Sequence, residues 1–372
     1  MSALKSKAPS SLRTTLAERV VIADGAMGTM LQAANPTLDD FQGFEGCNEI
    51  LNITRPELVA EIHRQYFSVG VDAVETNTFG ANLANLGEYG ISDRIYELAE
   101  AGAKIAREVA DSFTQPDSPK WVLGSLGPGT KLPTLGHATY EELRAAYEIA
   151  SRGLIDGGAD ALLIETTQDL LQAKAAVNGA RSAIDKSERD ILLIAQVTVE
   201  TTGTMLLGSE IGAALSSLSA LGIDLIGMNC ATGPAEMSEH LRTLSNSSTI
   251  GISCMPNAGL PILKDGGAFY PLGPNDLAKA LKDFVTTYGI SLIGGCCGTT
   301  PGHLKAVVDE VGGLKISSRK PTIEAGASSL YQFVPFRQDQ TYLAIGERTN
   351  ANGSKAFRDA LISEDWQACV EI

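Results

Sequence analysis

Residues 140–167 read YEELRAAYEIASRGLIDGGADALLIETT, and this stretch contains the unit that decides the fold. In its first part, apolar residues recur every three or four positions until a pair of glycines, which is typical of one face of a helix. Its last part is a short apolar run that ends in Glu165, Thr166 and Thr167. Because helices that alternate with short apolar strands build a parallel sheet, the stretch predicts an α/β protein.

The same alternation recurs along most of the chain. The predicted strands are residues 20–26, 72–79, 121–128, 161–167, 191–199, 224–230, 250–257 and 291–298. About eight such units over roughly 300 residues favour a closed (β/α)8 barrel of the TIM type. The alternative is an open, Rossmann-like sheet. It is disfavoured because DGAMGT at 24–29 lacks the GxGxxG spacing between first strand and first helix.

Composition excludes several classes of function. The 372 residues are 44% hydrophobic and carry a formal net charge of -15, so the chain can bury a large core but offers little attraction to nucleic acid or anionic lipid. We find no apolar signal segment near the N-terminus and no run of about 20 apolar residues. We therefore expect a cytoplasmic protein with small-molecule or protein partners, and no nucleic acid or membrane partner.

Three of the six cysteines stand at the ends of predicted strands. Cys230 ends LIGMNC, and the pair Cys296 and Cys297 lies in SLIGGCCGTTP. In a barrel the sixth and eighth strands are separated by one strand, so their carboxyl ends can meet. Three thiolates would bind Zn²⁺ and leave its fourth tetrahedral position for a substrate. The alternatives are a buried pair of small residues or a vicinal disulfide, and the rival ligands are His137, His240 and His303.

Polar residues end most of the other strands. Asp24 and Glu165 follow strongly apolar runs, and two carboxylates at one barrel mouth suit an ammonium group, although a single carboxylate there is often only a helix cap. Asn257 ends the seventh strand and is a candidate fourth zinc ligand in the absence of substrate, or else a turn-forming residue. Position alone makes three further residues candidates for substrate binding: Thr76, Asn77 and Ser125.

These motifs resemble those of the zinc-dependent homocysteine methyltransferases. The similarity runs from about residue 17 to 313 and includes, in the order of that family, DGAMGT, ETNTFGAN, GSLGP, ETTQD, GMNC, NCATGP, PNAGLP and GGCCGTTP. The resemblance implies that Cys230, Cys296 and Cys297 bind zinc, which activates the homocysteine thiol. It also implies that Asp24 and Glu165 hold the amino acid portion of homocysteine.

A further resemblance lies downstream. YLAIGERTNANGSKAFRDALI at 342–362 is similar to the opening strand, loop and helix of the pterin-binding barrel of cobalamin-dependent methionine synthases. This similarity implies that methylcobalamin, bound by a module absent from this chain, donates the methyl group that forms methionine, and that 5-methyltetrahydrofolate is the ultimate donor. The expected organisation is a tail at 1–16, a homocysteine-binding barrel at 17–313, a linker at 314–340 and an incomplete start of a second, pterin-binding barrel at 341–372.

Two other functions remain open from the sequence. The chain could be a stand-alone homocysteine S-methyltransferase that uses a sulfonium donor. It could also be a non-catalytic zinc-binding or redox-sensing domain, in which case the metal would have no open position for a thiol substrate.

Overall fold

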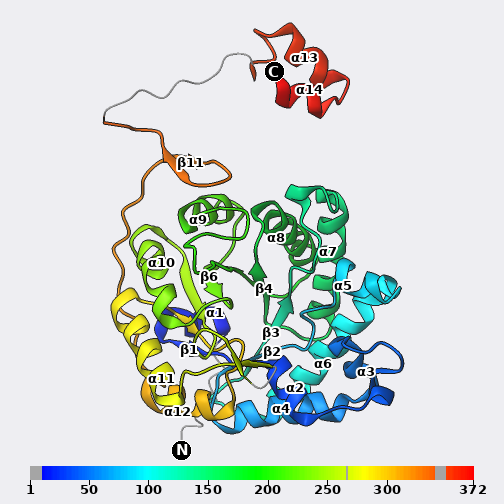
Figure 1. The fold of residues 1–372 in the computed structure, drawn as a ribbon. Helices are drawn as coiled ribbons and strands as arrows, with labels where there is room; N and C mark the ends of the chain where they lie inside the picture. Colours follow the sequence, from blue (N-terminus) through cyan, green and yellow to red (C-terminus); the bar gives the residue numbers. More distant parts are fainter. Residues whose placement is uncertain (1–10, 265–266, 340–348) are drawn as a thin grey trace, which may run out of the picture. The chain divides into compact units, whose positions relative to one another are not determined.

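The computed structural model describes residues 11–264, 267–339 and 349–372, and its main body is a barrel of parallel strands ringed by helices (Figure 1). The strands pair in the order β1-β10-β7-β6-β5-β4-β3-β2, every pair parallel. Each lies within one of the eight predicted runs, which confirms the (β/α)8 prediction and excludes the open, Rossmann-like alternative. Their bounds are β1 (Val21–Ile22), β2 (Ala73–Glu75), β3 (Trp121–Leu126), β4 (Ala161–Thr167), β5 (Leu192–Val197), β6 (Leu225–Asn229), β7 (Gly251–Met255) and β10 (Leu292–Ile293).

Helices connect these strands and cover the outside of the barrel (Figure 1). Their starts follow from sequence: Pro residues open α4, α10, α11 and α12, where the missing N–H is not needed, and Thr139 and Glu142 form a capping box at α7. The bounds are α2 (Met27–Ala34), α3 (Leu51–Thr54), α4 (Pro56–Ser68), α5 (Leu83–Glu88), α6 (Ile95–Phe113), α7 (Tyr140–Asp156), α8 (Leu170–Asp185), α9 (Ile211–Ser219), α10 (Pro234–Ser247), α11 (Pro274–Asp283) and α12 (Pro301–Val311).

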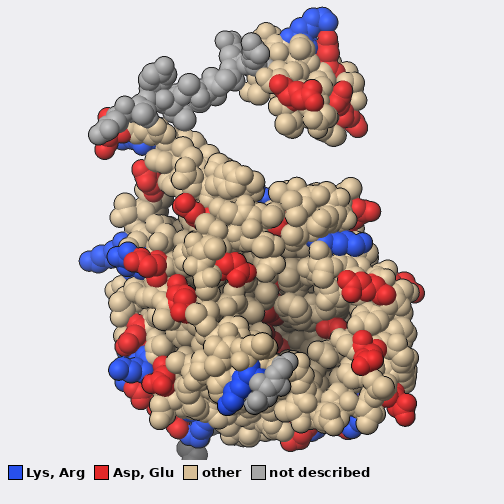
Figure 2. Space-filling model, in the orientation of Figure 1, with Lys and Arg blue, Asp and Glu red and all other residues tan. Residues whose placement is uncertain are grey.

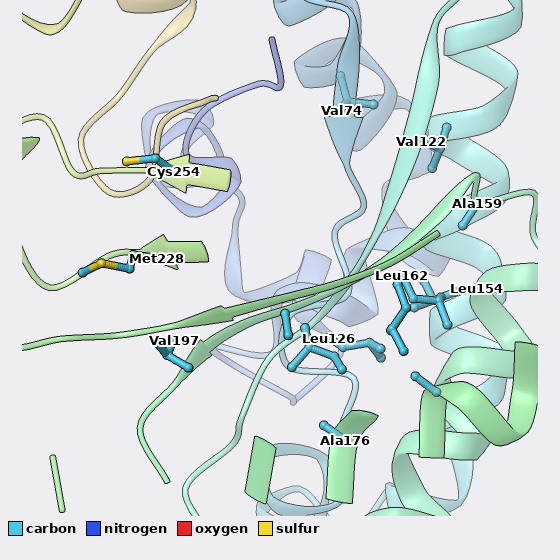
Figure 3. Close-up of a cluster of buried hydrophobic side chains, with 14 of the residues drawn as sticks. Val74, Val122, Leu126, Leu154, Ala159, Leu162, Ala176, Val197, Met228 and Cys254 are labelled. Carbon is cyan, nitrogen blue, oxygen red and sulfur yellow. The ribbon is translucent and has the colours of Figure 1, made fainter. Parts of the chain in front are cut away.

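Alternate residues of the strands face two separate cores. Val122, Leu162 and Met228 belong to the outer core, where the strands pack against helix residues such as Leu154 (Figure 3). The residues between them face the barrel interior, which contains Val21, Ala73, Trp121, Leu123, Leu163, Ile194, Leu225, Met255 and Leu292. This alternation with a period of two decides which polar residues at the strand ends point into the barrel.

The helix α1 (Leu12–Glu18) contributes two residues to the inner core. Leu12 and Leu16 are buried in the inner core with residues of the strands. The predicted boundary between tail and barrel, at residues 16 and 17, therefore falls inside this helix.

Asp72, just before β2, connects the first and second strands of the barrel through two hydrogen bonds. The N–H of Asp72 donates to the carbonyl of Ile22 at 2.7 Å, and the N–H of Ile22 donates to the carboxylate of Asp72 at 3.0 Å. Asp160 and Asp224, which precede β4 and β6, make the same pair of bonds with the preceding odd-numbered strand. These repeated bonds fix the stagger of neighbouring strands, and with it the position of each strand end at the barrel mouth.

Residues after α12 continue along the barrel. The guanidinium of Arg319 donates to the carbonyls of Ser248 and Ile250, and the carbonyl of Leu330 accepts a hydrogen bond from Ser209. The structure divides into two compact units, and residues 328–333 belong with the barrel. The predicted linker at 314–340 thus includes residues that contact the barrel, and the two short strands β11 (Gly326–Ser328) and β12 (Phe333–Pro335).

The second unit contains residues 325–327 and 334–372. Its helices are α13 (Lys355–Ile362), which Ser354 caps, and α14 (Trp366–Glu371), which Asp365 caps. Most of the strand predicted to open a pterin-binding barrel lies outside the described residues. Within the described parts of the chain, no helix is both long enough and apolar enough to cross a membrane.

Candidate metal and amino-acid site

The three cysteines predicted to bind a metal come together at the carboxyl ends of β6 and β10. The sulfur atoms of Cys230, Cys296 and Cys297 all lie within 4.8 Å of one another, and those of Cys230 and Cys297 are 3.8 Å apart. Among residues 11–264, 267–339 and 349–372, this is the group of Cys, His or acidic residues placed closely enough to hold a metal ion. His137, His240 and His303 do not belong to it.

The backbone has unusual conformations next to the three thiols. Cys230 and Ala231 have φ values of 60° and 57°, a left-handed conformation that is strained for residues with a Cβ. Gly298 follows the cysteine pair with φ 78°, and its Cα lies against the ring of Tyr270, where a Cβ would overlap that ring. The N–H of Cys296 donates to the carbonyl of Pro256 at 2.8 Å. Strain of this kind persists only where surrounding contacts hold it, and it is common at functional sites.

The thiols influence one another strongly. Hydrogen bonds from Cys230 and Cys296 lower the pKa of Cys297 to about 3, because they stabilise its thiolate. The hydrogen bonds of Cys296 with Cys230 and Cys297 raise the pKa of Cys296 well above its ordinary value. Without a metal, the cluster therefore favours one thiolate, and a bound cation must displace protons from the other thiols.

Carboxylates line the same end of the barrel. Glu165, at the end of β4, accepts a hydrogen bond from the hydroxyl of Ser125 at 2.5 Å and one from Asn229 at 3.0 Å. Asp24, just after β1, is 1% exposed; its Oδ1 accepts from the N–H of Glu75, whereas its Oδ2 has no partner among the described residues. Figure 2 shows a hollow in this face of the molecule with acidic side chains at its walls.

Glu75 is a third carboxylate of this group, and it was not among the predicted site residues. Ala73 faces the barrel interior and Val74 the outer core, so the next residue, Glu75, points inward again. Burial, above all, raises the pKa of Asp24, Glu75 and Glu165, and the charge of Glu165 raises the pKa of Glu75 further. The alternation of β2 was the signal in the sequence that could have identified Glu75.

The other predicted residues lie in different surroundings. The hydroxyl of Thr76 is within 2.6 Å of the Thr78 hydroxyl and accepts from the N–H of Ser125, and the amide of Asn77 donates to Asn52 and to the carbonyl of Asn48. Both residues thus fasten the loop after β2, whereas Ser125 contacts Glu165. Asn257 follows β7, and its buried Oδ1 has no partner within the described parts of the chain.

The donor atoms fit a soft divalent cation. Thiolates select zinc and similar ions, and three of them would supply three of the four ligands of a tetrahedral ion. The unpartnered Oδ2 of Asp24 and the neighbouring Glu165 fit an ammonium group. The fold and this site define a (β/α)8-barrel protein with a cluster of three thiols beside a group of buried carboxylates.

The chain belongs to the homocysteine S-methyltransferase family, whose sequence model matches residues 21–311. It is 60% identical over 361 residues to a methionine synthase of Mycobacterium tuberculosis (strain ATCC 25618 / H37Rv). It is 59% identical over 366 residues to a methionine synthase of Mycobacterium leprae (strain TN). These matches cover 97% of this chain and 30% of each relative, so the chain spans about a third of the length of the curated relatives it matches.

Solved structures of the Escherichia coli homocysteine methyltransferase MmuM have the same fold. Its oxidized form matches with a TM-score of 0.63 and 22% identity over 78% of this chain and 95% of that chain. Its metallated form matches with the same TM-score and identity over 77% and 95%.

Proposed function

We propose that this chain binds homocysteine at the barrel mouth and activates its thiol, through a zinc ion, for methylation to methionine. The observation that carries the proposal is the position of three thiols within 4.8 Å of one another at the barrel end that also holds Asp24 and Glu165. Membership of the homocysteine S-methyltransferase family supports it. The cytoplasm, which is reducing, would keep these thiols available for a metal.

Asp24 and Glu165 bind the ammonium group of the substrate in this proposal. Asp24 Oδ2 is buried without a partner among the described residues, and Glu165 is fixed by Ser125 and Asn229. Burial raises the pKa of both carboxyl groups and so favours their neutral forms. An arriving ammonium group would counteract this, because it stabilises the ionised forms. Burial also raises the pKa of Glu75, a third carboxyl group beside these two, and a cation would favour its ionised form in the same way.

Cys230, Cys296 and Cys297 would hold the zinc ion, and Asn257 Oδ1 would occupy the fourth position when no substrate is present. When bound, zinc supplies a Lewis acid that favours the thiolate form of the substrate sulfur at neutral pH. A free thiol has a pKa of about 8.5 and is mostly protonated there, and the protonated form is a poor nucleophile.

The methyl donor approaches the substrate sulfur from the open end of the barrel. A lone pair of the sulfur forms the new S–C bond, and the electron pair of the broken bond stays with the donor. We propose that the donor is methylcobalamin carried by another module, and that 5-methyltetrahydrofolate restores it. The methionine synthases at 59–60% identity, which are about three times as long as this chain, support that choice over a sulfonium donor.

Residues 341–372 are, in this proposal, the beginning of the pterin-binding module that uses the folate. Their described part is assigned to a separate compact unit. Ile362, Trp366 and Val370 on α13 and α14 are exposed by 60% or more, and such large apolar side chains are usually covered within a domain. The proposed module is tested by folate binding to a chain extended to the length of the mycobacterial relatives.

X-ray absorption at the zinc and selenium edges tests the central proposal. The zinc-loaded chain is measured alone and with selenohomocysteine. The expected result is three sulfur ligands and one lighter ligand without substrate, and a zinc–selenium contact with substrate. An unchanged coordination shell would instead support a non-catalytic zinc domain. Assays of homocysteine methylation with free methylcobalamin and with S-methylmethionine then decide between the two donor classes.

A further inference from the structure

Asn229 is the last residue of β6, and both polar atoms of its side chain form hydrogen bonds with the end of β4. Its Nδ2 donates to Oε2 of Glu165 at 3.0 Å and to the hydroxyl of Thr166 at 2.8 Å, and its Oδ1 accepts from the N–H of Thr166 at 2.7 Å. The residue is only 1% exposed. In a buried site such bonds are strongly directional, and they fix the position of the groups they join.

The same side chain reaches the metal-binding thiols. Asn229 Nδ2 lies 3.9 Å from the sulfur of Cys296, within the range of a weak N–H···S hydrogen bond, and Asn229 directly precedes Cys230 in the chain. One amide nitrogen therefore contacts both the carboxylate proposed to bind the substrate ammonium and a sulfur proposed to bind the metal. No sequence motif singled out this residue for a role of its own.

Thr166 shows how firmly Asn229 fixes the end of β4. Its φ is 56°, and a β-branched residue in this region is a genuine outlier, which persists only where surrounding contacts hold it. The two hydrogen bonds between Asn229 and Thr166 stabilise this conformation. This strained residue comes immediately after Glu165, within the irregular last part of β4, so Asn229 fixes both the carboxylate and the backbone that carries it.

We propose that Asn229 is a positioning residue that sets the separation between the Glu165 carboxylate and the Cys296 sulfur, and so the length of amino-acid thiol that the site accepts. This inference rests on the proposed function. The ammonium and the sulfur of homocysteine are one methylene further apart than those of cysteine. A site with a fixed separation discriminates against such a change by about 10–200-fold, whereas a site with a loose separation discriminates less.

The test uses the full 372-residue chain loaded with Co²⁺, whose thiolate charge-transfer absorption reports ligands entering the metal site. Homocysteine and cysteine are titrated separately, and the ratio of their dissociation constants is compared between variants. Asn229→Ala removes every bond of the amide. Asn229→Asp keeps the shape and the acceptor for the Thr166 N–H but removes the N–H groups that face Glu165 and Cys296, so it remains informative if Asn229→Ala does not fold.

Gln196→Ala is the matched control. Gln196 is a fully buried amide of the neighbouring strand β5, and its Nε2 donates to the Ser253 hydroxyl at 3.0 Å rather than to a site residue. The wild-type chain should prefer homocysteine by at least about tenfold. That preference should fall at least about fivefold in Asn229→Asp and persist in Gln196→Ala.

The outcomes separate the inference from the proposed function. A wild-type preference that both Asn229 variants retain overturns the inference and leaves homocysteine binding intact. A wild-type chain whose cobalt spectrum responds to neither thiol overturns the proposed function and the inference together. A purely structural role for Asn229 would lower thermal stability without changing the ratio, and this result also contradicts the inference.

Discussion

The backbone N–H of Glu75 donates a 3.0 Å hydrogen bond to Oδ1 of Asp24, and this bond crosses the seam between β1 and β2. It brings Glu75 into a pocket that also contains Glu165, and burial raises the pKa of all three carboxyl groups. Ionising these buried carboxyl groups costs free energy mainly because they lose hydration, and the repulsion between them adds to that cost in the metal-free, substrate-free chain. The pocket is therefore expected to weaken the fold as the pH rises.

Glu75→Gln is expected to stabilise the metal-free chain at neutral pH and above. The pKa of Glu75 is higher in the folded chain than its ordinary value of 4.5, so the stability it contributes is complete below pH 4.5 and is lost as the pH rises. Gln does not ionise, and the free energy of unfolding of the variant should exceed that of wild type increasingly above pH 4.5. The difference should change by at most about 1.4 kcal/mol per pH unit. Urea denaturation at pH 5, 6.5 and 8 measures it.

Glu148→Gln is the control, because the pKa of Glu148 is shifted in the opposite direction from that of Glu75. The hydrogen bond from Lys186 lowers the pKa of Glu148 to about 2, so the contribution of this side chain is present at neutral pH and is lost on acidification. The free energy of unfolding of Glu148→Gln should differ most from that of wild type above pH 4.5 and least near pH 2. A Glu75→Gln effect that is the same at every pH would contradict the assignment of a raised pKa.

Cys296→Ala should lose zinc and keep its fold. The substitution removes one of three sulfur ligands at a strand end and leaves a small apolar residue there. Mass spectrometry of the metal content should show about one zinc per wild-type chain and almost none in the variant, with unchanged far-ultraviolet circular dichroism. Cys254→Ala is the control, because this fully buried thiol of β7 faces Met237 in the outer core. It should lose about 1 kcal/mol of stability and no zinc.

Glu165→Gln should weaken homocysteine binding and leave the zinc content unchanged. The amide can still accept from Ser125, but it no longer attracts an ammonium group, and a charge-assisted bond of about 1.5–3 kcal/mol corresponds to a roughly 10–150-fold loss of affinity. Titration calorimetry on the zinc-loaded chain measures this. The control is Glu49→Gln, because this buried carboxylate accepts from the N–H of Gly80, outside the proposed site. Equal affinities for Glu165→Gln and wild type would remove Glu165 from the site.

The barrel was predictable because its strands are unambiguous in the sequence. Each is a short apolar run bounded by polar residues and glycine, since both faces of a barrel strand are buried. The three thiols were predictable for a related reason: β6 and β10 lie one strand apart, so their carboxyl ends had to be near each other. These predictions needed only residue type and position along a strand.

Other features of the site depend on which way a side chain points. Thr76 and Asn77 stand at a strand end as Glu75 does, but the loop after β2 directs them to Thr78 and Asn52, while Glu75 faces the interior. Tyr270 approaches the cysteines from a connection between β7 and α11 that no pattern in the sequence assigns to the site. Such contacts follow from tertiary packing, and a single sequence does not specify them.

His63 on α4 gives a second pH-dependent prediction, far from any motif. It is fully buried, neither ring nitrogen has a partner among the described residues, and burial lowers its pKa to about 3. Because the unfolded chain binds the proton near pH 6.5, stability is lost as the pH falls from 6.5 towards 3, by up to about 1.4 kcal/mol per unit. In His63→Leu this pH dependence should vanish. The free energy of unfolding of the variant should therefore rise relative to that of wild type as the pH falls. Parallel stability curves between pH 7.5 and 5 would contradict the prediction.

Gly298 and Gly313 form a matched pair that separates backbone strain from crowding at the metal site. Their φ values are 78° and 76°, so an alanine is equally strained at either position, by about 1–2 kcal/mol. At Gly313 an added Cβ meets nothing within 4 Å, whereas at Gly298 it overlaps the ring of Tyr270. Gly298→Ala must therefore displace Tyr270 or shift the turn that carries Cys297, and overpacking of this kind adds about 1–3 kcal/mol.

The two alanine variants should also differ in zinc affinity. The Tyr270 hydroxyl helps to lower the pKa of the Cys297 thiol, so displacement of the ring should remove an interaction that stabilises the thiolate. Competition with a chromophoric chelator should show zinc held about 10–100-fold more weakly by Gly298→Ala than by Gly313→Ala. If the two variants bind zinc equally, the Tyr270 contact does not support the metal site. If they also lose equal stability, the close packing of Tyr270 on Gly298 is wrong as well.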